Sequence, residues 1–186
     1  MTLSEALEGV QHRRAAIEQV DQEERILTVR AIPYNVETRL APGLVESFAP
    51  GAFKAACKDP DRYHLWMGHS DVGGHLTGRT TMVEDRADGL WVETRVSRTP
   101  AGEELLTLVR DGVLQEASIE FHPMPDWYTQ TQRGADVVWR HKRAKFLGVA
   151  LVPRGAYGRE AVVSAVRDDR EQARVAAVAH LRSLCG

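Results

Sequence analysis

One serine in this sequence has the surroundings that a nucleophile needs. Ser118 lies in the middle of the run from Gly112 to His122 (Gly-Val-Leu-Gln-Glu-Ala-Ser-Ile-Glu-Phe-His), which alternates like a short strand. A small hydroxyl on a rigid strand can attack a carbonyl when a base lies within reach. Most strand serines only meet solvent or bond to their neighbours, so this position alone leaves both interpretations open.

His69 is the candidate for that base. It follows a predicted strand over residues 63–67 and lies in the loop Gly68-His69-Ser70-Asp71, from which a side chain can project into a cleft. An imidazole titrates near neutral pH and is the natural proton acceptor for a serine hydroxyl. Spacing along the chain does not test the pair, because catalytic triads are recognised by geometry and roles.

The same region allows a metal site as an alternative. His64, His69 and His75 fall within twelve residues, and clustered histidines can bind zinc. No pair of them has the i,i+4 spacing of helical ligands, and no cysteine joins them. Three unrelated histidines are the simpler interpretation, and a zinc-dependent hydrolase is the competing one.

The composition is that of an ordinary globular protein. The chain has 186 residues, of which 43% are hydrophobic and 27% charged, and a net charge of −2 favours neither a nucleic acid nor an anionic membrane as partner. Cys57 and Cys185 lie far apart and indicate no disulfide framework. There is no apolar run of ~20 residues and no signal-peptide core. No Gly-rich phosphate loop occurs either. A reducing, cytosolic compartment and no cofactor are therefore expected.

Short strands and a few helices must position these residues. Strands are predicted over residues 25–32, 45–48, 63–67, 76–83, 90–96, 112–122, 137–139, 145–152 and 161–166, and helices over 2–20, 52–58, 99–111 and from 168 onward. Asp88-Gly89 predicts a hairpin, and residues 123–136 a polar, mobile loop. Because strands and helices do not alternate regularly, the pattern favours an α+β fold. The expected architecture is an antiparallel, Greek-key-like barrel of about seven strands flanked by a few helices.

Three parts are expected along the chain. Residues 1–24 carry a peripheral helix, residues 25–167 form the barrel domain, and residues 168–186 form an amphipathic helix. The last helix has apolar side chains at a spacing of three, namely Val175, Val178, Leu181 and Leu184. Such a stripe packs on its own domain more often than on a partner, so it permits a homodimer without requiring one.

Five segments, taken together, resemble a known family. They are Val45-Glu46-Ser47-Phe48-Ala49-Pro50-Gly51-Ala52-Phe53, Trp66-Met67-Gly68-His69-Ser70-Asp71, Asp88-Gly89-Leu90, Gly112 to Phe121, and Leu147 to Tyr157. In that order they resemble the N-terminal signature, the catalytic His motif, the hairpin, the nucleophile strand, and the closing strand and turn of the tailed-phage prohead (capsid maturation) proteases. The resemblance covers residues 25–167 in the family's order, which is far more specific than any single segment.

The resemblance implies a serine endopeptidase with a herpesvirus-assemblin-like barrel. Such an enzyme cleaves scaffold, the scaffolding arm of the capsid protein, and often itself, inside the immature capsid in the host cytoplasm. Ser118 matches the nucleophile position and His69 the general base. Backbone N–H groups in the turn after the last barrel strand would stabilise the oxyanion, with Arg154 and Gly155 as the candidates.

The third catalytic residue is where the chain departs from that family. Many relatives carry a Glu or His where this chain has Gly148, and a glycine cannot orient an imidazole. Glu120, on the face of Ser118 and ~6.5–7 Å along the strand, is the first choice, His141 the second and Asp71 the third, and a plain Ser–His dyad is also open. The same departure keeps a second class of function in view, an inactive capsid-assembly or scaffolding module.

Overall fold

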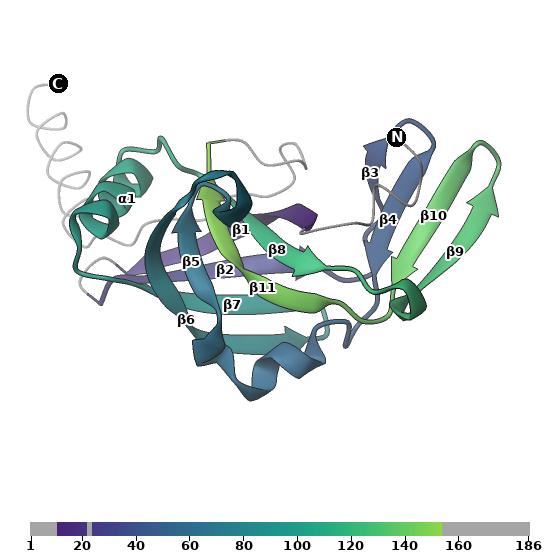
Figure 1. Cartoon of the computed structure of the whole chain (residues 1–186), viewed down its shortest axis with the longest axis horizontal. Helices are drawn as coiled ribbons and strands as arrows, with labels where there is room; N and C mark the ends of the chain where they lie inside the picture. The colour runs from purple at the N-terminus through teal and green to yellow at the C-terminus, as the bar shows by residue number, and fades with distance from the viewer. Residues whose placement is uncertain (1–10, 22–23, 154–186) are drawn as a thin grey trace, which may run out of the picture.

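A closed barrel of seven strands forms the body of the protein. The computed structural model describes residues 11–21 and 24–153 (Figure 1), and the strand order around the barrel is β1-β2-β7-β6-β5-β11-β8. The bounds are β1 Gln11–Asp21, β2 Ile26–Pro33, β5 His64–Met67, β6 His75–Arg86, β7 Gly89–Val96, β8 Glu116–His122 and β11 Lys145–Val152. Six of the seven neighbouring pairs are antiparallel, and β5 with β11 is the parallel one. The predicted barrel is confirmed, with one parallel pair that the sequence did not indicate.

A second sheet stands at the end of the molecule opposite the α-helix (Figure 1). It has the order β3-β4-β10-β9, with β3 Thr38–Ala41, β4 Leu44–Phe48, β9 Tyr128–Arg133 and β10 Asp136–His141. The mobile loop predicted for residues 123–136 is therefore wrong over β9. Five of the six β9 residues are exposed, so the strand lacks the apolar alternation that marks a half-buried strand. Its backbone bonds to β10 form it instead.

Short helices connect the strands. The helix predicted from Thr99 is α1 Pro100–Arg110, whose first turn is capped by the Thr99 hydroxyl, which accepts a hydrogen bond from the Gly102 N–H at 3.1 Å. The helix predicted over 52–58 is the 3-10 segment η2 Lys54–Lys58. The other 3-10 turns are η3 Pro60–Arg62, η4 Ser70–Val72 and η5 Pro125–Trp127.

The N-terminal helix expected over residues 2–20 is wrong where the structure describes it. Gln11–Asp21 is a strand that pairs with β2 on one side and β8 on the other, so the barrel begins before residue 25. Without it, β2 and β8 would each present an unpaired edge of backbone N–H and C=O groups. This long-range demand outweighs the local helical spacing of Val10 and Ile17. The strand and helix expected beyond residue 160 lie outside the described residues.

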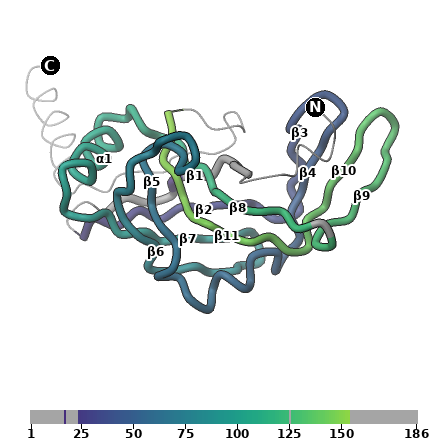
Figure 2. Tube along the Cα trace, viewed as in Figure 1, coloured from purple at the N-terminus to yellow at the C-terminus, as the bar shows by residue number. Residues whose placement is uncertain are grey.

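The core fixes β8 from the inside of the barrel. Ala117, Ile119 and Phe121 are fully buried in the main hydrophobic cluster. The two side chains that alternate with them, Ser118 and Glu120, are each 2% exposed on the opposite face. Figure 2 traces β8 and β11 side by side across the barrel, in the register that the backbone pairing defines. A strand buried on both faces is a rigid platform for a reactive group.

Candidate active site

Two cross-strand rows connect the serine strand to the histidine turn. Ser118 on β8 pairs with Ala150 on β11, which pairs with Trp66 on β5. One pleat away, Glu120 pairs with Gly148, and Gly148 with His64. Neighbouring strands lie ~4.8 Å apart. The end of β5 therefore stands about two strand spacings, ~10 Å, from β8, within reach of a loop that folds back.

The turn after β5 folds back in this way. Gly68 has a φ of +77° and donates its N–H to the Leu151 carbonyl at 2.9 Å, which ties the turn to β11. The His69 carbonyl then accepts the N–H of Gly74 at 2.8 Å and closes the loop. A Cβ on Gly74 would stand 2.4 Å from the Gly68 carbonyl oxygen, so only glycine allows this closure. The turn thus carries the imidazole of His69 to the face of β8 that bears Glu120.

Glu120 lies against that imidazole. Its Oε1 is 3.6 Å from Nδ1 of His69, whose side chain is 24% exposed. This is longer than a hydrogen bond, as is common for catalytic contacts before substrate binds. A carboxylate at Nδ1 orients the ring so that Nε2 is the nitrogen left for the serine proton. Glu120, the first choice for the third residue, is thus the carboxylate beside His69.

Ser118 shares the face of β8 with Glu120. Its hydroxyl has one weak contact, 3.5 Å to the carbonyl oxygen of Ile119. This distance is at the outer limit for a hydrogen bond and does not commit the hydroxyl proton. The structure thus brings together His69 and Glu120 by direct approach, and Glu120 and Ser118 by the alternation of one strand.

His141, the second choice, is engaged elsewhere. It ends β10 in the second sheet, where its Nε2 lies 2.7 Å from Oε1 of Glu46 and its ring stacks on Phe48 at 4.8 Å. The third choice, Asp71, is exposed in η4. The oxyanion candidates Arg154 and Gly155 lie outside the described residues, and their role stays a prediction.

The close packing of β11 against β5 explains why a glycine stands at position 148. A Cβ at this position would stand 2.8 Å from the backbone oxygen of His64 on the parallel strand β5. A larger residue would therefore force β5 and β11 apart. Glu120 is the cross-strand partner of Gly148 on β8, so its carboxylate reaches His69 from the adjacent strand. The departure from the family pattern is thus matched by a carboxylate one strand over.

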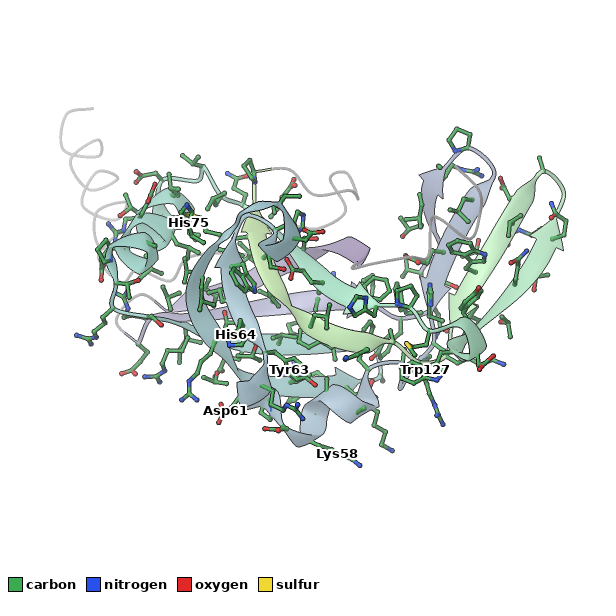
Figure 3. The ribbon with its side chains drawn as sticks, in the orientation of Figure 1. Lys58, Asp61, Tyr63, His64, His75 and Trp127 are labelled. Carbon is green, nitrogen blue, oxygen red and sulfur yellow. The ribbon has the colours of Figure 1, made fainter. Side chains whose placement is uncertain are left out.

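The part of the chain that the structure describes has no arrangement of side chains suited to hold zinc. No group of three His, Cys, Asp or Glu side chains is placed there to hold a metal ion. His64 on β5 and His75 on β6 are both exposed and lie at separate positions (Figure 3), while His69 faces Glu120.

Cys57 is not an alternative nucleophile. Burial raises the pKa of its thiol above the ordinary value, so the reactive thiolate is disfavoured at neutral pH. The neighbouring Tyr34 is buried as well, and burial, followed by the nearby Asp85 carboxylate, raises the pKa of the phenol. The hydroxyl of Ser118 is therefore the better nucleophile candidate.

One residue of the site was missed from the sequence. Ser70 donates both its backbone N–H, at 2.8 Å to Oε1, and its hydroxyl, at 2.6 Å to Oε2, to the carboxylate of Glu120. Its position directly after His69 was the available signal. No local pattern shows that a residue 50 positions later in the chain receives these bonds.

A closed barrel that holds a histidine turn against a strand bearing a serine and a buried glutamate has the parts of a serine peptidase. The sequence profile of the caudovirus prohead serine proteases matches residues 13–174. The chain belongs to this family and is a serine peptidase, as its resemblance to the prohead proteases implies.

The solved structure of the bacteriophage T4 capsid assembly protease is similar in fold. The TM-score is 0.53 and the sequences are 10% identical, over 77% of this chain and 97% of that chain. At this identity the likeness concerns the barrel fold alone. No curated protein matches the chain by sequence. Among the residues that the structure describes, no helix is long and apolar enough to cross a membrane.

Proposed function

We propose that this prohead-type serine peptidase cleaves peptide bonds with Ser118 as nucleophile, His69 as general base and Glu120 as the carboxylate that orients the base. The observation that carries the proposal is the approach of Glu120 to Nδ1 of His69 at 3.6 Å, from the same strand face as Ser118. A buried carboxylate beside one ring nitrogen is what an imidazole needs to act as base through the other.

The chemistry follows from these three roles. Nε2 of His69 takes the hydroxyl proton as Oγ of Ser118 bonds to the substrate carbonyl carbon, and the negative charge of Glu120 stabilises the imidazolium. The tetrahedral intermediate collapses to an acyl-enzyme when the imidazolium gives its proton to the leaving amine. Water, deprotonated by the same imidazole, then hydrolyses the ester and restores the serine. Backbone N–H groups around Arg154 and Gly155 are the proposed oxyanion donors.

The proposed substrates are the scaffolding arm of the capsid protein or a separate scaffold protein, and the protease itself, inside the immature capsid. The family assignment supports this class of substrate, and the T4 relative is itself a capsid assembly protease. Ser118 is 2% exposed, so its hydroxyl must be uncovered before it can attack the carbonyl carbon of a substrate. Such a covered site fits an enzyme that becomes active on assembly, for which a homodimer is one proposed form.

Ser118→Ala tests the proposal directly. The variant should neither process co-expressed capsid or scaffold protein nor react with a fluorophosphonate probe, and it should unfold at the same temperature as the wild type. Ser97→Ala removes an exposed serine hydroxyl in front of α1 and is the matched control. Full processing by Ser118→Ala would remove the assignment. Absence of labelling in the wild-type protein would leave the inactive assembly module as the better description.

A further inference from the structure

We propose that Ser70 is a positioning residue of the active site: it holds the carboxylate of Glu120 in the orientation in which Oε1 faces His69. The inference rests on the proposed function and adds a fourth residue to it. Ser70 acts through Glu120 and does not touch the reacting atoms.

Ser70 controls both oxygens of the carboxylate. The backbone N–H donates to Oε1 at 2.8 Å and the hydroxyl to Oε2 at 2.6 Å. The terminal torsion of a glutamate is a broad, nearly two-fold rotor. Two donors from one residue, each aimed at a different oxygen, restrict that rotation. The orientation they select is the one in which Oε1 stands 3.6 Å from Nδ1 of His69.

Burial makes these two bonds necessary. Glu120 is 2% exposed, and an ionised carboxylate removed from water is costly unless charged or polar partners replace the lost hydration. Hydrogen bonds that end on an ionised oxygen are shorter and stronger than neutral ones, and the 2.6 Å contact from the Ser70 hydroxyl has this character. Ser70 thereby supports the charged carboxylate that the imidazolium requires.

The hydroxyl of Ser70 is committed by the same geometry. It donates its proton to Oε2 of Glu120, whereas, among the residues that the structure describes, the hydroxyl of Ser118 has only the 3.5 Å contact to a carbonyl. Of the two serines, the one that follows His69 and the one that shares the β8 face of Glu120, Ser118 keeps the proposed role of nucleophile and Ser70 takes that of positioning residue. Because Ser70 follows His69 directly, one turn of the chain places both the base and the group that holds its carboxylate.

The test measures the rate at which a fluorophosphonate probe labels the full-length protein. Ser70→Ala, which keeps the backbone donor and removes the hydroxyl, should label about 10- to 100-fold more slowly. Ser70→Thr keeps a hydroxyl and should restore most of the rate. Thr81→Val is the matched control, because it also removes a hydroxyl that donates to a carboxylate, that of Glu93 at 2.8 Å. Thr81 lies on β6 and Glu93 on β7, and neither residue is part of the proposed site. It should label within about twofold of the wild type.

A double-mutant cycle separates positioning from general damage. If Ser70 acts through Glu120, Ser70→Ala should slow labelling in the wild-type background and have no further effect in a Glu120→Gln background. Additive losses, or a wild-type rate for Ser70→Ala, would overturn the positioning role alone. Absence of labelling that depends on Ser118 in the wild type would instead overturn the proposed function. Thermal unfolding of each variant shows that the compared proteins are folded.

Discussion

In the part of the chain that the structure describes, two buried glutamates each lie beside a histidine, and the two pairs differ in burial and in distance. In the second sheet, Glu46 and His141 are 1% and 0% exposed and lie 2.7 Å apart. At the barrel, Glu120 is equally buried, but its partner His69 is 24% exposed and stands 3.6 Å away. The first histidine is sealed in the interior, whereas the second keeps one side of its ring toward the surface.

The surroundings of the two pairs explain the contrast. The ring of His141 stacks on Phe48 and meets Phe121 and Tyr128 at 5.9 and 5.6 Å between centroids, so aromatic groups enclose it. The ring of His69 sits on a turn, and its carboxylate is held by Ser70 rather than by the histidine itself. A pair that joins two strands needs a short direct bond, while the proposed catalytic pair needs a carboxylate held in place and a ring that can reach a substrate. Removing either glutamate should therefore damage a different property.

Of changes to the two glutamates, Glu120→Gln is expected to have the larger effect on activity. The amide keeps the size of the side chain but cannot stabilise an imidazolium, and loss of the orienting carboxylate in a serine peptidase can cost about 10⁴ in rate. Labelling by a fluorophosphonate should fall by roughly 10³-fold or more, with a small change in unfolding temperature. A Glu120→Gln variant that labels at the wild-type rate would show that a Ser–His dyad suffices.

Glu46→Ala should damage stability instead. It leaves His141 buried without its carboxylate, and breaking a buried pair by removing one partner costs about 3–5 kcal/mol. The free energy of unfolding, measured by denaturant titration, should fall by about this amount. The labelling rate per folded molecule should stay within about twofold of the wild type. If the labelling rate per folded molecule fell along with the free energy of unfolding, the Glu46–His141 pair would belong to the active site. That result would contradict the contrast between the two pairs.

The smallest effect is expected from acid on the exposed end of the second sheet. Hydrogen bonds from Arg133 lower the pKa of Glu37, and those from Arg39 lower the pKa of Asp136. Carboxyls with a lowered folded pKa contribute stability above their unfolded values of 4.5 and 3.8, and lose it as the pH falls through the folded values. These groups are exposed and screened, so the contribution is modest.

Hydrogen exchange measured at matched intrinsic rates checks the acid effect. Below about pH 4, amides of β9 and β10 should lose protection before those of β8 and β11. In Arg133→Gln the acid-dependent part of this loss should shrink. A simultaneous loss of protection in both sheets would mean that the exposed ion pairs do not control the second sheet.

Local signals were sufficient where a short segment carries its own information. The Asp88-Gly89 hairpin and the helix that begins after Thr99 are present as predicted, and the strand through Ser118 is present from Glu116 onward. They depend on turn residues, a capping hydroxyl and alternation, which act over a few residues. The motif around His69 and Ser118 indicated the family for the same reason, because each of its segments is contiguous.

The pairing of segments that lie far apart in the chain could not be predicted from local signals. Gln11–Asp21 has helical spacing but becomes a strand because two barrel edges need a partner. Tyr128–Arg133 lacks apolar alternation but pairs with β10. In both segments the backbone hydrogen bonds of a neighbour outweigh the local pattern.

By itself, the sequence determined the peptidase family, the barrel class and the two residues proposed as nucleophile and base. Only the tertiary structure separated Glu120, which is bonded to Ser70, from His141, which is bonded to Glu46, because these contacts join positions 50 and 95 residues apart. Both side chains look alike as polar groups near a strand end. The register of β8 and the turn after β5 bring Glu120 and His69 together. The pairing of β4 with β10 places His141 against Glu46.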